Sequence, residues 1–355
     1  MTIFRGRRPR VRRIAFLVIG ALSLTVLAAP ANASTVTQVR FTPQPVLAPK
    51  VPATKPGEPV KIDQEVKALG SVALEMSATQ TAYVRSVMRA NSATYRSLFD
   101  NEVRCTWPGG EQSYVTGQNV LQQGASLEPE KEDVQLTTRF LVHPGVATKV
   151  TCTAYVRAAT MRDTLDARFQ LHEGFLEFAA TSVANTADGL PAQRATPRGL
   201  VRVGPDPQVV AREPALPYFT LAPGFTKLSV FADTEYKTCY PVKDKDCTKP
   251  PSSTATFTLF VNQWNGDRLC QSSNATTTTR RMSYSVHHHY VALHLPDFKV
   301  RTDCEQRFNA YVLVKWQDGM DGGVQGTAIG LTDSRGSATT HNAGMSHVFV
   351  VPLKS

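Results

Sequence analysis

The chain contains few of the short motifs that identify an enzyme family from sequence. It has no G-x-S-x-G nucleophile elbow, no H-E-x-x-H zinc motif and no C-x-x-C pair. After residue 33, no apolar run approaches the roughly 20 residues that a membrane-spanning helix needs. These absences leave serine-hydrolase, metalloprotease and zinc-finger chemistry without support. They also predict no transmembrane segment in the mature chain.

A strong charge of one sign is also missing outside the first 33 residues. The formal net charge is +10, but six of the 39 Lys and Arg residues lie in that first segment, where there is no acid. The rest of the chain has 39 − 6 = 33 basic and 29 acidic residues, so its net charge is near +4. Nucleic-acid binding calls for a clustered basic surface, and a small, scattered excess predicts no nucleic-acid partner.

Residues 1–33 predict an export signal. Their arginines precede an apolar run from Ile14 to Ala29, and the small-residue sequence Ala31-Asn32-Ala33 follows. A charged start, a short apolar stretch and an A-x-A end form the pattern that signal peptidase cleaves. We therefore expect cleavage near Ala33 and a secreted, extracellular or envelope-associated protein. The pair Arg12-Arg13 leaves two export routes open, the general route and the twin-arginine route.

The six cysteines predict three disulfides, because an exported chain matures where thiols oxidise. Cys105 and Cys152 each lie on the apolar side of a segment in which polar and apolar residues alternate. Two such residues can meet across a core, and the chain-entropy model gives a loop of this length roughly 4 kcal/mol of stabilisation. Closeness along the chain suggests the other two bridges, Cys239–Cys247 and Cys270–Cys304.

Proline-rich segments predict how the chain is divided. Residues 34–66 favour an extended tether, and residues 191–223 favour a second proline-rich linker, because proline lacks the N–H that a central strand needs. Between and after them, residues 67–190 and 224–355 alternate apolar and polar residues and are punctuated by Gly and Pro turns. This period of two is typical of antiparallel sheet.

The predicted fold is therefore mainly β, with two disulfide-stabilised antiparallel β-sandwich domains in series, immunoglobulin-like or jelly-roll-like. The inward pair Cys105 and Cys152 resembles the inter-sheet disulfide of immunoglobulin-type sandwiches. Trp107 lies only two residues after the first cysteine, and Val150 stands where that family has a tyrosine. The resemblance implies a sandwich but no function.

A histidine cluster is the clearest candidate for a metal site. If residues 283–295 form a strand, His287 and His289 share one face, and His288 and His294 share the other. Two imidazoles two residues apart can bind one divalent ion with a third ligand from a neighbouring strand. The alternative is a polar strand face on which the histidines pack against tyrosines.

Trp264 is the candidate for contact with a ligand. It stands beside Asn265-Gly266, a hairpin signal, and so at the end of a strand rather than on an apolar face. An exposed aromatic ring there could stack on a sugar.

Together these observations predict a secreted, non-catalytic binding or structural protein of the bacterial cell envelope or exterior, with no catalytic residue and no cofactor. Its partner would be an unknown extracellular protein or a cell-wall glycan. The alternative is a secreted metal-dependent hydrolase or metal-binding module that uses His287 and His289. Paired carboxylates for glycoside cleavage stay open, because their geometry exists only in three dimensions.

Overall fold

The computed structural model describes residues 36–50, 65–91, 94, 97–120, 133–160, 166–205, 210–238, 252–283, 288–327, 331–332, 338–339 and 344–354. The predicted signal segment lies outside these residues, as do Cys239, Cys247 and His287. The described part of the chain consists of strands and connections, without a helix. Consequently none of its elements is a helix long and apolar enough to cross a membrane.

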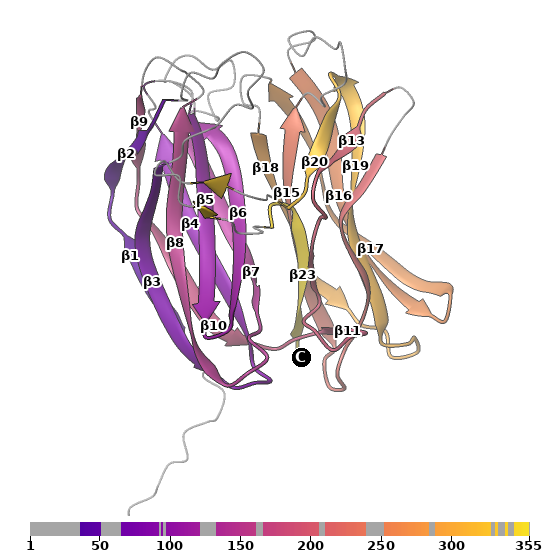
Figure 1. Cartoon of the computed structure of the whole chain (residues 1–355). Coiled ribbons are helices and arrows are strands. Elements are labelled where there is room, and N and C mark those ends of the chain that lie inside the picture. The colour runs from indigo at the N-terminus through magenta and orange to yellow at the C-terminus, as the bar shows by residue number, and fades with distance from the viewer. Residues whose placement is uncertain are drawn as a thin grey trace, which may run out of the picture. The chain divides into compact units, whose positions relative to one another are not determined.

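Ten strands before residue 182 form two antiparallel sheets (Figure 1). The order in sheet 1 is β1-β10-β4-β9-β2, with β7 also paired to β4, and the order in sheet 2 is β3-β8-β5-β6. The strands are β1 (Thr37–Phe41), β2 (Gln44–Ala48), β3 (Glu65–Met76), β4 (Thr81–Asn91), β5 (Ser97–Trp107), β6 (Gly110–Val120), β7 (Asp133–Val142), β8 (Thr148–Thr160), β9 (Ala167–Leu171) and β10 (Gly174–Thr181).

The later strands form two larger antiparallel sheets and one small pair. Sheet 3 has the order β11-β14-β19-β16-β17, and sheet 4 has the order β12-β23-β15-β20-β13, with β18 also paired to β15. The strands are β11 (Asn185–Thr186), β12 (Gln193–Ala195), β13 (Leu200–Val203), β14 (Val210–Thr220), β15 (Lys227–Thr238), β16 (Ser252–Asn265), β17 (Arg268–Ser283), β18 (His288–Lys299), β19 (Arg307–Gly319), β20 (Gly322–Gln325), β21 (Leu331–Thr332), β22 (Ala338–Thr339) and β23 (His347–Leu353).

The buried apolar side chains form two clusters. The first extends from Phe41 to Phe178 and the second from Ala184 to Val350. The period-two pattern explains them, because alternate residues of a strand point to the same face. On β16, for example, Phe257 and Val261 are fully buried in the second cluster. The described residues nevertheless belong to one compact unit, Ser34–Ser355.

Two described disulfides join the cysteines that the sequence pairs, Cys105–Cys152 and Cys270–Cys304. The third predicted bridge, Cys239–Cys247, lies outside the described residues. The expected geometry of the first bridge is wrong. Cys105 of β5 lies directly opposite Cys152 of β8 in the same sheet, so the bridge joins neighbouring strands rather than crossing a core. Strand parity could not distinguish these cases, because two residues opposite each other in one sheet also share a face.

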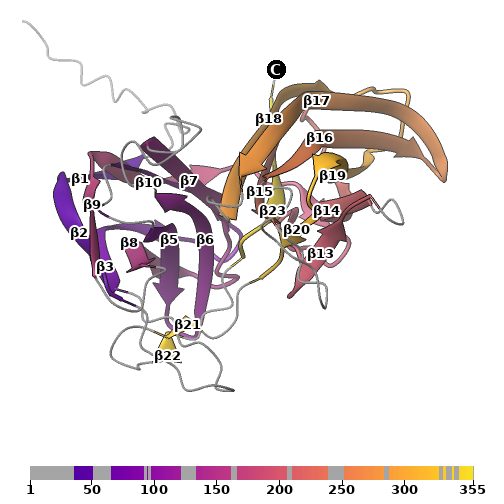
Figure 2. The ribbon, with the colours of Figure 1, turned by 90° about the horizontal axis from the view of Figure 1, so that it is seen from above.

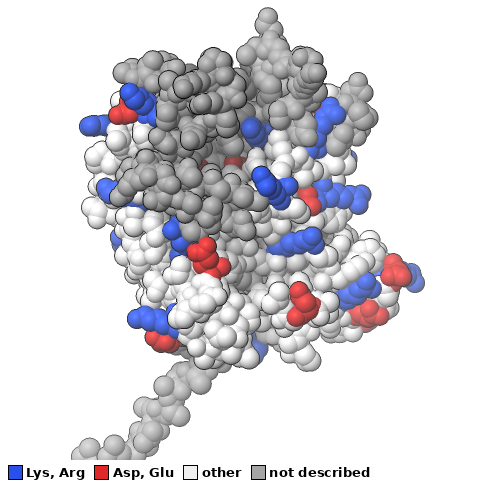
Figure 3. Space-filling model, in the orientation of Figure 1, with Lys and Arg blue, Asp and Glu red and all other residues white. Residues whose placement is uncertain are grey.

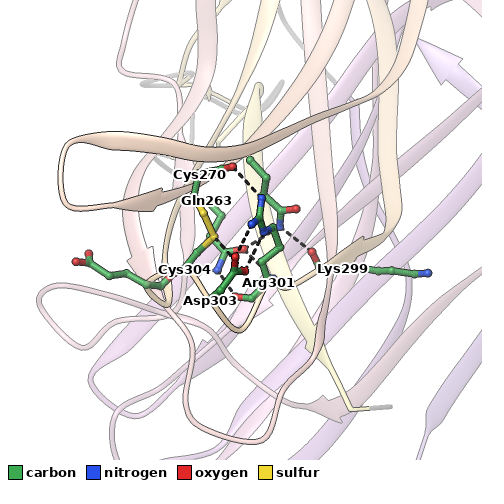
Figure 4. Close-up of a disulfide and its surroundings, with 8 residues drawn as sticks. Gln263, Cys270, Lys299, Arg301, Asp303 and Cys304 are labelled. Carbon is green, nitrogen blue, oxygen red and sulfur yellow. Dashed lines mark hydrogen bonds and ion pairs between the residues drawn. A yellow bond between two sulfur atoms is a disulfide. The ribbon is translucent and has the colours of Figure 1, made fainter.

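The second bridge fixes a turn to sheet 3. Cys270 belongs to β17, and Cys304 lies in the connection between β18 and β19 (Figure 4). Gln263 of β16 supports the same connection: its Nε2 donates to the carbonyl oxygens of Arg301 and Glu305, each at 2.9 Å. The connection that leads into β19 is therefore held by a covalent bond and by a buried amide.

Part of the predicted tether and part of the predicted linker form strands instead. β1 and β2 lie within residues 34–66, pair with β10 and β9, and bury Phe41 and Val46. Within residues 191–223, β14 pairs with β19 although it contains two prolines. The register shifts of this ladder fall at Arg212/Ala215 and Leu216/Phe219, on either side of each proline. At these irregular positions the ladder does not need a proline N–H. Proline content alone therefore wrongly predicted a linker where β14 forms.

Candidate active site at a buried carboxylate cluster

The candidate site is centred on β15, a strand that has both faces buried. Ala232 and Tyr236 point into the second hydrophobic cluster. The opposite face carries Asp233 and Glu235, which are 0% and 1% exposed. A buried carboxylate needs a charge partner or hydrogen bonds, or else it becomes protonated. The two acids meet this requirement in different ways.

Asp233 is fully ion-paired. Arg139 of β7 donates to it from Nε and Nη2, each at 2.9 Å, and the hydroxyl of Tyr290 on β18 donates at 2.7 Å. Although burial lowers the pKa of Arg139, the charge of Asp233 raises it further, so the guanidinium keeps its charge. The interaction links sheet 1 to sheet 4, and we regard it as a structural clamp.

Glu102 of β5 is the second ion-paired acid. Arg157 of β8 lies 2.6 Å from its Oε2, and Arg104 lies 2.9 Å from its Oε1. Burial raises the pKa of Glu102, but the two guanidinium groups outweigh burial and hold the pKa below its ordinary value. This acid therefore stays an anion.

Asp100 and Glu235 are the remaining buried acids of this region, and neither is ion-paired with an Arg or Lys of the described residues. Asp100 lies on β5 directly opposite Gly117 of β6. A Cβ atom on Gly117 would collide with Oδ1 of Asp100 and lie 3.7 Å from Oε2 of Glu235. The two carboxyl groups therefore converge on the space that the missing glycine side chain leaves free.

The environment favours the protonated form of both groups. Burial, and then the charge of Glu235, raise the pKa of Asp100 from 3.8 to about 8, against the opposing charge of Arg157. Burial also raises the pKa of Glu235 from 4.5 to about 8, although the Gly117 N–H and the Lys237 ammonium oppose this. Two neighbouring carboxyl groups in one dry site titrate as a pair and retain a proton at neutral pH.

His288 of β18 connects this pair to the surface. Its Nδ1 lies 2.6 Å from Oε1 of Glu235, and its side chain is 23% exposed, against 1% for Glu235. Burial, and then the charge of Lys237, lower the pKa of His288 to about 4. The arrangement is thus a neutral carboxylic acid that donates to a neutral imidazole. Oε2 of Glu235 is buried and has no hydrogen-bond partner among the described residues.

The strands around the site are fixed by hydrogen bonds. The Glu235 N–H donates to Oγ of Ser346 at 3.0 Å, and the Val115 N–H of β6 donates to the carbonyl oxygen of Gly344 at 3.0 Å. The Tyr290 N–H of β18 donates to Oε1 of Gln118 on β6 at 3.3 Å. Figure 2 shows β6 and β18 side by side, as these bonds require. The carboxyl pair is therefore held by three chain segments that are distant in sequence.

Of the two predicted metal ligands, His289 is a described residue and His287 is not. His289 is 2% exposed and lies on the face of β18 that packs against the second hydrophobic cluster. Its Nε2 lies 3.3 Å from the carbonyl oxygen of Ser283. His294 lies on the opposite face and interacts with Oγ of Ser229 at 2.8 Å. The described residues contain no group of three His, Cys, Asp or Glu side chains placed for a metal ion. His287 is not among them, so the metal site stays a prediction.

Trp264 is half-buried rather than free. Its Nε1 donates to Oδ1 of Asn309 at 2.9 Å, and its ring stands edge-on to Tyr218, with ring centroids 6.0 Å apart. Tyr218 is the more accessible ring, 40% exposed. Contact of Trp264 with a ligand stays a prediction.

Asp100 and Glu235 were missed for a physical reason. In β5, Asp100, Glu102 and Arg104 alternate with Phe99, Val103 and Cys105, which is the pattern of a strand with one face in water. The sequence Asp233-Thr-Glu235 gives the same impression in β15. Only the packing of other segments on these faces makes the charges buried.

No protein-family model and no curated protein matches the chain. Among solved structures, a "putative secreted protein" from Parabacteroides distasonis aligns over 90% of this chain and 89% of its own, with 5% identity and a TM-score of 0.21. PNGF-II aligns over 89% and 66%, with 8% identity and a TM-score of 0.27. A peptide-N(4)-(N-acetyl-beta-D-glucosaminyl) asparagine amidase aligns over 89% and 100%, with 9% identity and a TM-score of 0.26. Likenesses this low establish neither a family nor a function.

Proposed function

We propose that this protein is an exported hydrolase that uses Asp100 and Glu235 as a general acid–base pair. The observation that carries the proposal is the contrast among four buried acids. Asp233 and Glu102 are neutralised by arginines, whereas Asp100 and Glu235 face each other at Gly117 without such partners. Burying two unpaired carboxyl groups is costly, and perturbed pairs of this kind cluster at catalytic sites.

The pair provides the two functions that hydrolysis of a glycosidic or amide bond requires. In the state in which one of the two groups has ionised, the protonated carboxyl can protonate the leaving group, and the ionised one can remove a proton from the attacking water. Oε2 of Glu235 is the atom that meets substrate or water in this mechanism. His288 is a positioning residue in this scheme, because it contacts Oε1 and holds the Glu235 carboxyl in one orientation.

The cellular setting follows from the disulfides, which persist outside the cytosol. Export through a signal cleaved near Ala33 is part of the proposal, as is the division into two sandwich domains. Two separate hydrophobic clusters support that division. The charges on the face shown in Figure 3 are of both signs and intermixed, which favours no highly charged polymer as substrate.

A non-catalytic binding or structural protein is the second candidate. Near-complete burial favours it, because Asp100 is 4% exposed and Glu235 is 1% exposed. In that case the pair would respond to pH without meeting a substrate. The metal-dependent alternative with His287 and His289 gains no further support from the described residues.

Activity assays with two conservative variants separate these candidates. Asp100→Asn and Glu235→Gln keep the shape of each side chain but remove the titrating group, whereas Glu75→Gln alters an exposed acid on β3. The purified mature protein is tested on β-glycosides, an N-glycosylated peptide and peptide amides from pH 4 to 10. We expect one substrate class to be cleaved with a bell-shaped pH profile, and each site variant to lose at least a hundredfold in kcat. Cleavage that both variants retain, or no cleavage of any class by the wild type, would reject the hydrolase and leave the binding protein.

A further inference from the structure

A pocket lies between β11, β12 and β14. Its volume is about 590 Å³, which is in the range of small-molecule sites. The lining comes from the chain between β11 and β14 and includes Asp188, Leu190, Arg194, Pro217 and Tyr218. The lining residues all fall between residues 186 and 218, so neither Asp100 nor Glu235 lines this pocket.

Tyr218 forms a rigid aromatic wall of this pocket. The guanidinium carbon of Arg307 lies 3.6 Å from its ring centroid, and Trp264 stands at 84° to it. Arg307 is itself fixed, because its Nη1 donates to the carbonyl oxygen of Gly266 at 2.9 Å. The Cys270–Cys304 bridge and Gln263 hold the connection just before Arg307 (Figure 4). A ring already fixed in this way loses little conformational freedom when a ligand packs on it.

The polar groups of the pocket carry opposite charges. Asp188 is held by the hydroxyl of Thr186 and by the Leu190 N–H, and it is exposed. Arg194 is also exposed. Because the charges of Asp188 and Arg194 offset each other, the pocket favours neither an anion nor a cation, whereas hydroxyl groups can donate to the carboxylate and accept from the guanidinium.

Apolar surface completes the site. Leu190 is 54% exposed and Tyr218 is 40% exposed, and both border the same pocket. A ligand that is apolar on one side and rich in hydroxyl groups at its edge matches this combination. A pyranose ring has both properties, with C–H groups on its faces and hydroxyls around its rim.

We propose that this pocket binds a neutral sugar, with Tyr218 as the stacking platform and Asp188 and Arg194 as hydrogen-bonding groups. Because the pocket is separate from Asp100 and Glu235, this proposal does not depend on the proposed hydrolysis. It gives the protein an accessory carbohydrate site, whether or not the carboxyl pair is catalytic.

Titration with neutral disaccharides tests the site. Maltose, cellobiose and N,N′-diacetylchitobiose are added to the mature protein, and binding is followed by saturation-transfer NMR and calorimetry. We expect at least one of them to bind in the millimolar range, and Tyr218→Ala to weaken it at least tenfold. Tyr218→Phe should retain binding because it keeps the ring. Val210→Ala, an exposed residue of the same strand that does not line the pocket, should leave binding unchanged.

Three results would overturn the proposal. The first is failure of all three sugars to bind wild-type protein. The second is equal binding by the Tyr218→Ala variant, with circular dichroism showing that it is folded. The third is tighter binding of glucuronate or glucosamine, because a charged ligand would contradict the argument from Asp188 and Arg194. Sugar binding that survives Asp100→Asn and Glu235→Gln would show that the two sites are independent.

Discussion

Replacement of Asp100 by asparagine should change how stability depends on pH. Its carboxyl group has a pKa of about 8 in the folded protein, against 3.8 when it is in water. Because the folded state binds this proton more tightly, the group contributes most stability below the unfolded pKa. That contribution is lost as pH rises through the folded value. At about 1.4 kcal/mol for each tenfold change in proton affinity, the whole effect is about 6 kcal/mol.

The asparagine variant lacks this dependence because its amide does not titrate. Between pH 5 and 7 the free energy of unfolding of the wild type should therefore fall, relative to the variant, by about 1.4 kcal/mol per pH unit. At pH 8 the variant should be the more stable protein, even though a buried amide without good partners costs about 1–3 kcal/mol. Loss of activity with a gain in stability is expected at a functional site.

Urea unfolding followed by circular dichroism at pH 5, 6, 7 and 8 measures this difference, with the disulfides kept oxidised. Asp318→Asn is the control, because Asp318 lies on β19 and is exposed. It should leave the pH dependence unchanged. A wild-type and Asp100→Asn difference that stays constant across this range would refute the reasoning, since the carboxyl would then ionise as it does in water.

Three other perturbations test the surrounding structure. Gly117→Ala should destabilise the protein by about 1–3 kcal/mol, because its methyl group would collide with the buried carboxyl of Asp100; an unchanged midpoint of urea unfolding would contradict this. Asp233→Ala should cost about 3–5 kcal/mol by leaving Arg139 buried without its partner. A double-mutant cycle with Arg139→Ala should recover part of that cost, and additive effects would rule out the clamp. Replacing both Cys105 and Cys152 by alanine should remove about 4 kcal/mol of stability, and equal stability with and without the bridge would dispute its role.

Much of the strand structure could be predicted from local patterns. The alternation in residues 255–261 and 150–156 correctly identified which side chains are buried, because burial on a strand repeats every second residue. Pairing of Cys105 with Cys152 and of Cys270 with Cys304 was also predicted. The failures came from proline, since β14 accommodates Pro214 and Pro217 at irregularities that no local rule foresees.

The candidate site could not be predicted in the same way. In the sequence, Asp100 and Glu235 are ordinary polar residues of alternating strands. The adjacent histidines 287–289 are a more distinctive pattern, and they predicted a metal site instead. His288 does belong to the carboxyl cluster, but as a partner of Glu235 rather than as a metal ligand. Its role depends on a residue that lies far away along the chain.

The sequence by itself determined the β character of the chain, the buried faces of its strands and the partners of four cysteines. These properties depend on the alternation of neighbouring residues and on disulfide bonds, so they can be predicted from the amino-acid sequence. Only the tertiary structure decided which acids lose contact with water and which of those gain an arginine. Burial and charge pairing depend on how distant strands pack, and for Asp100 and Glu235 that packing raises the pKa of two common side chains.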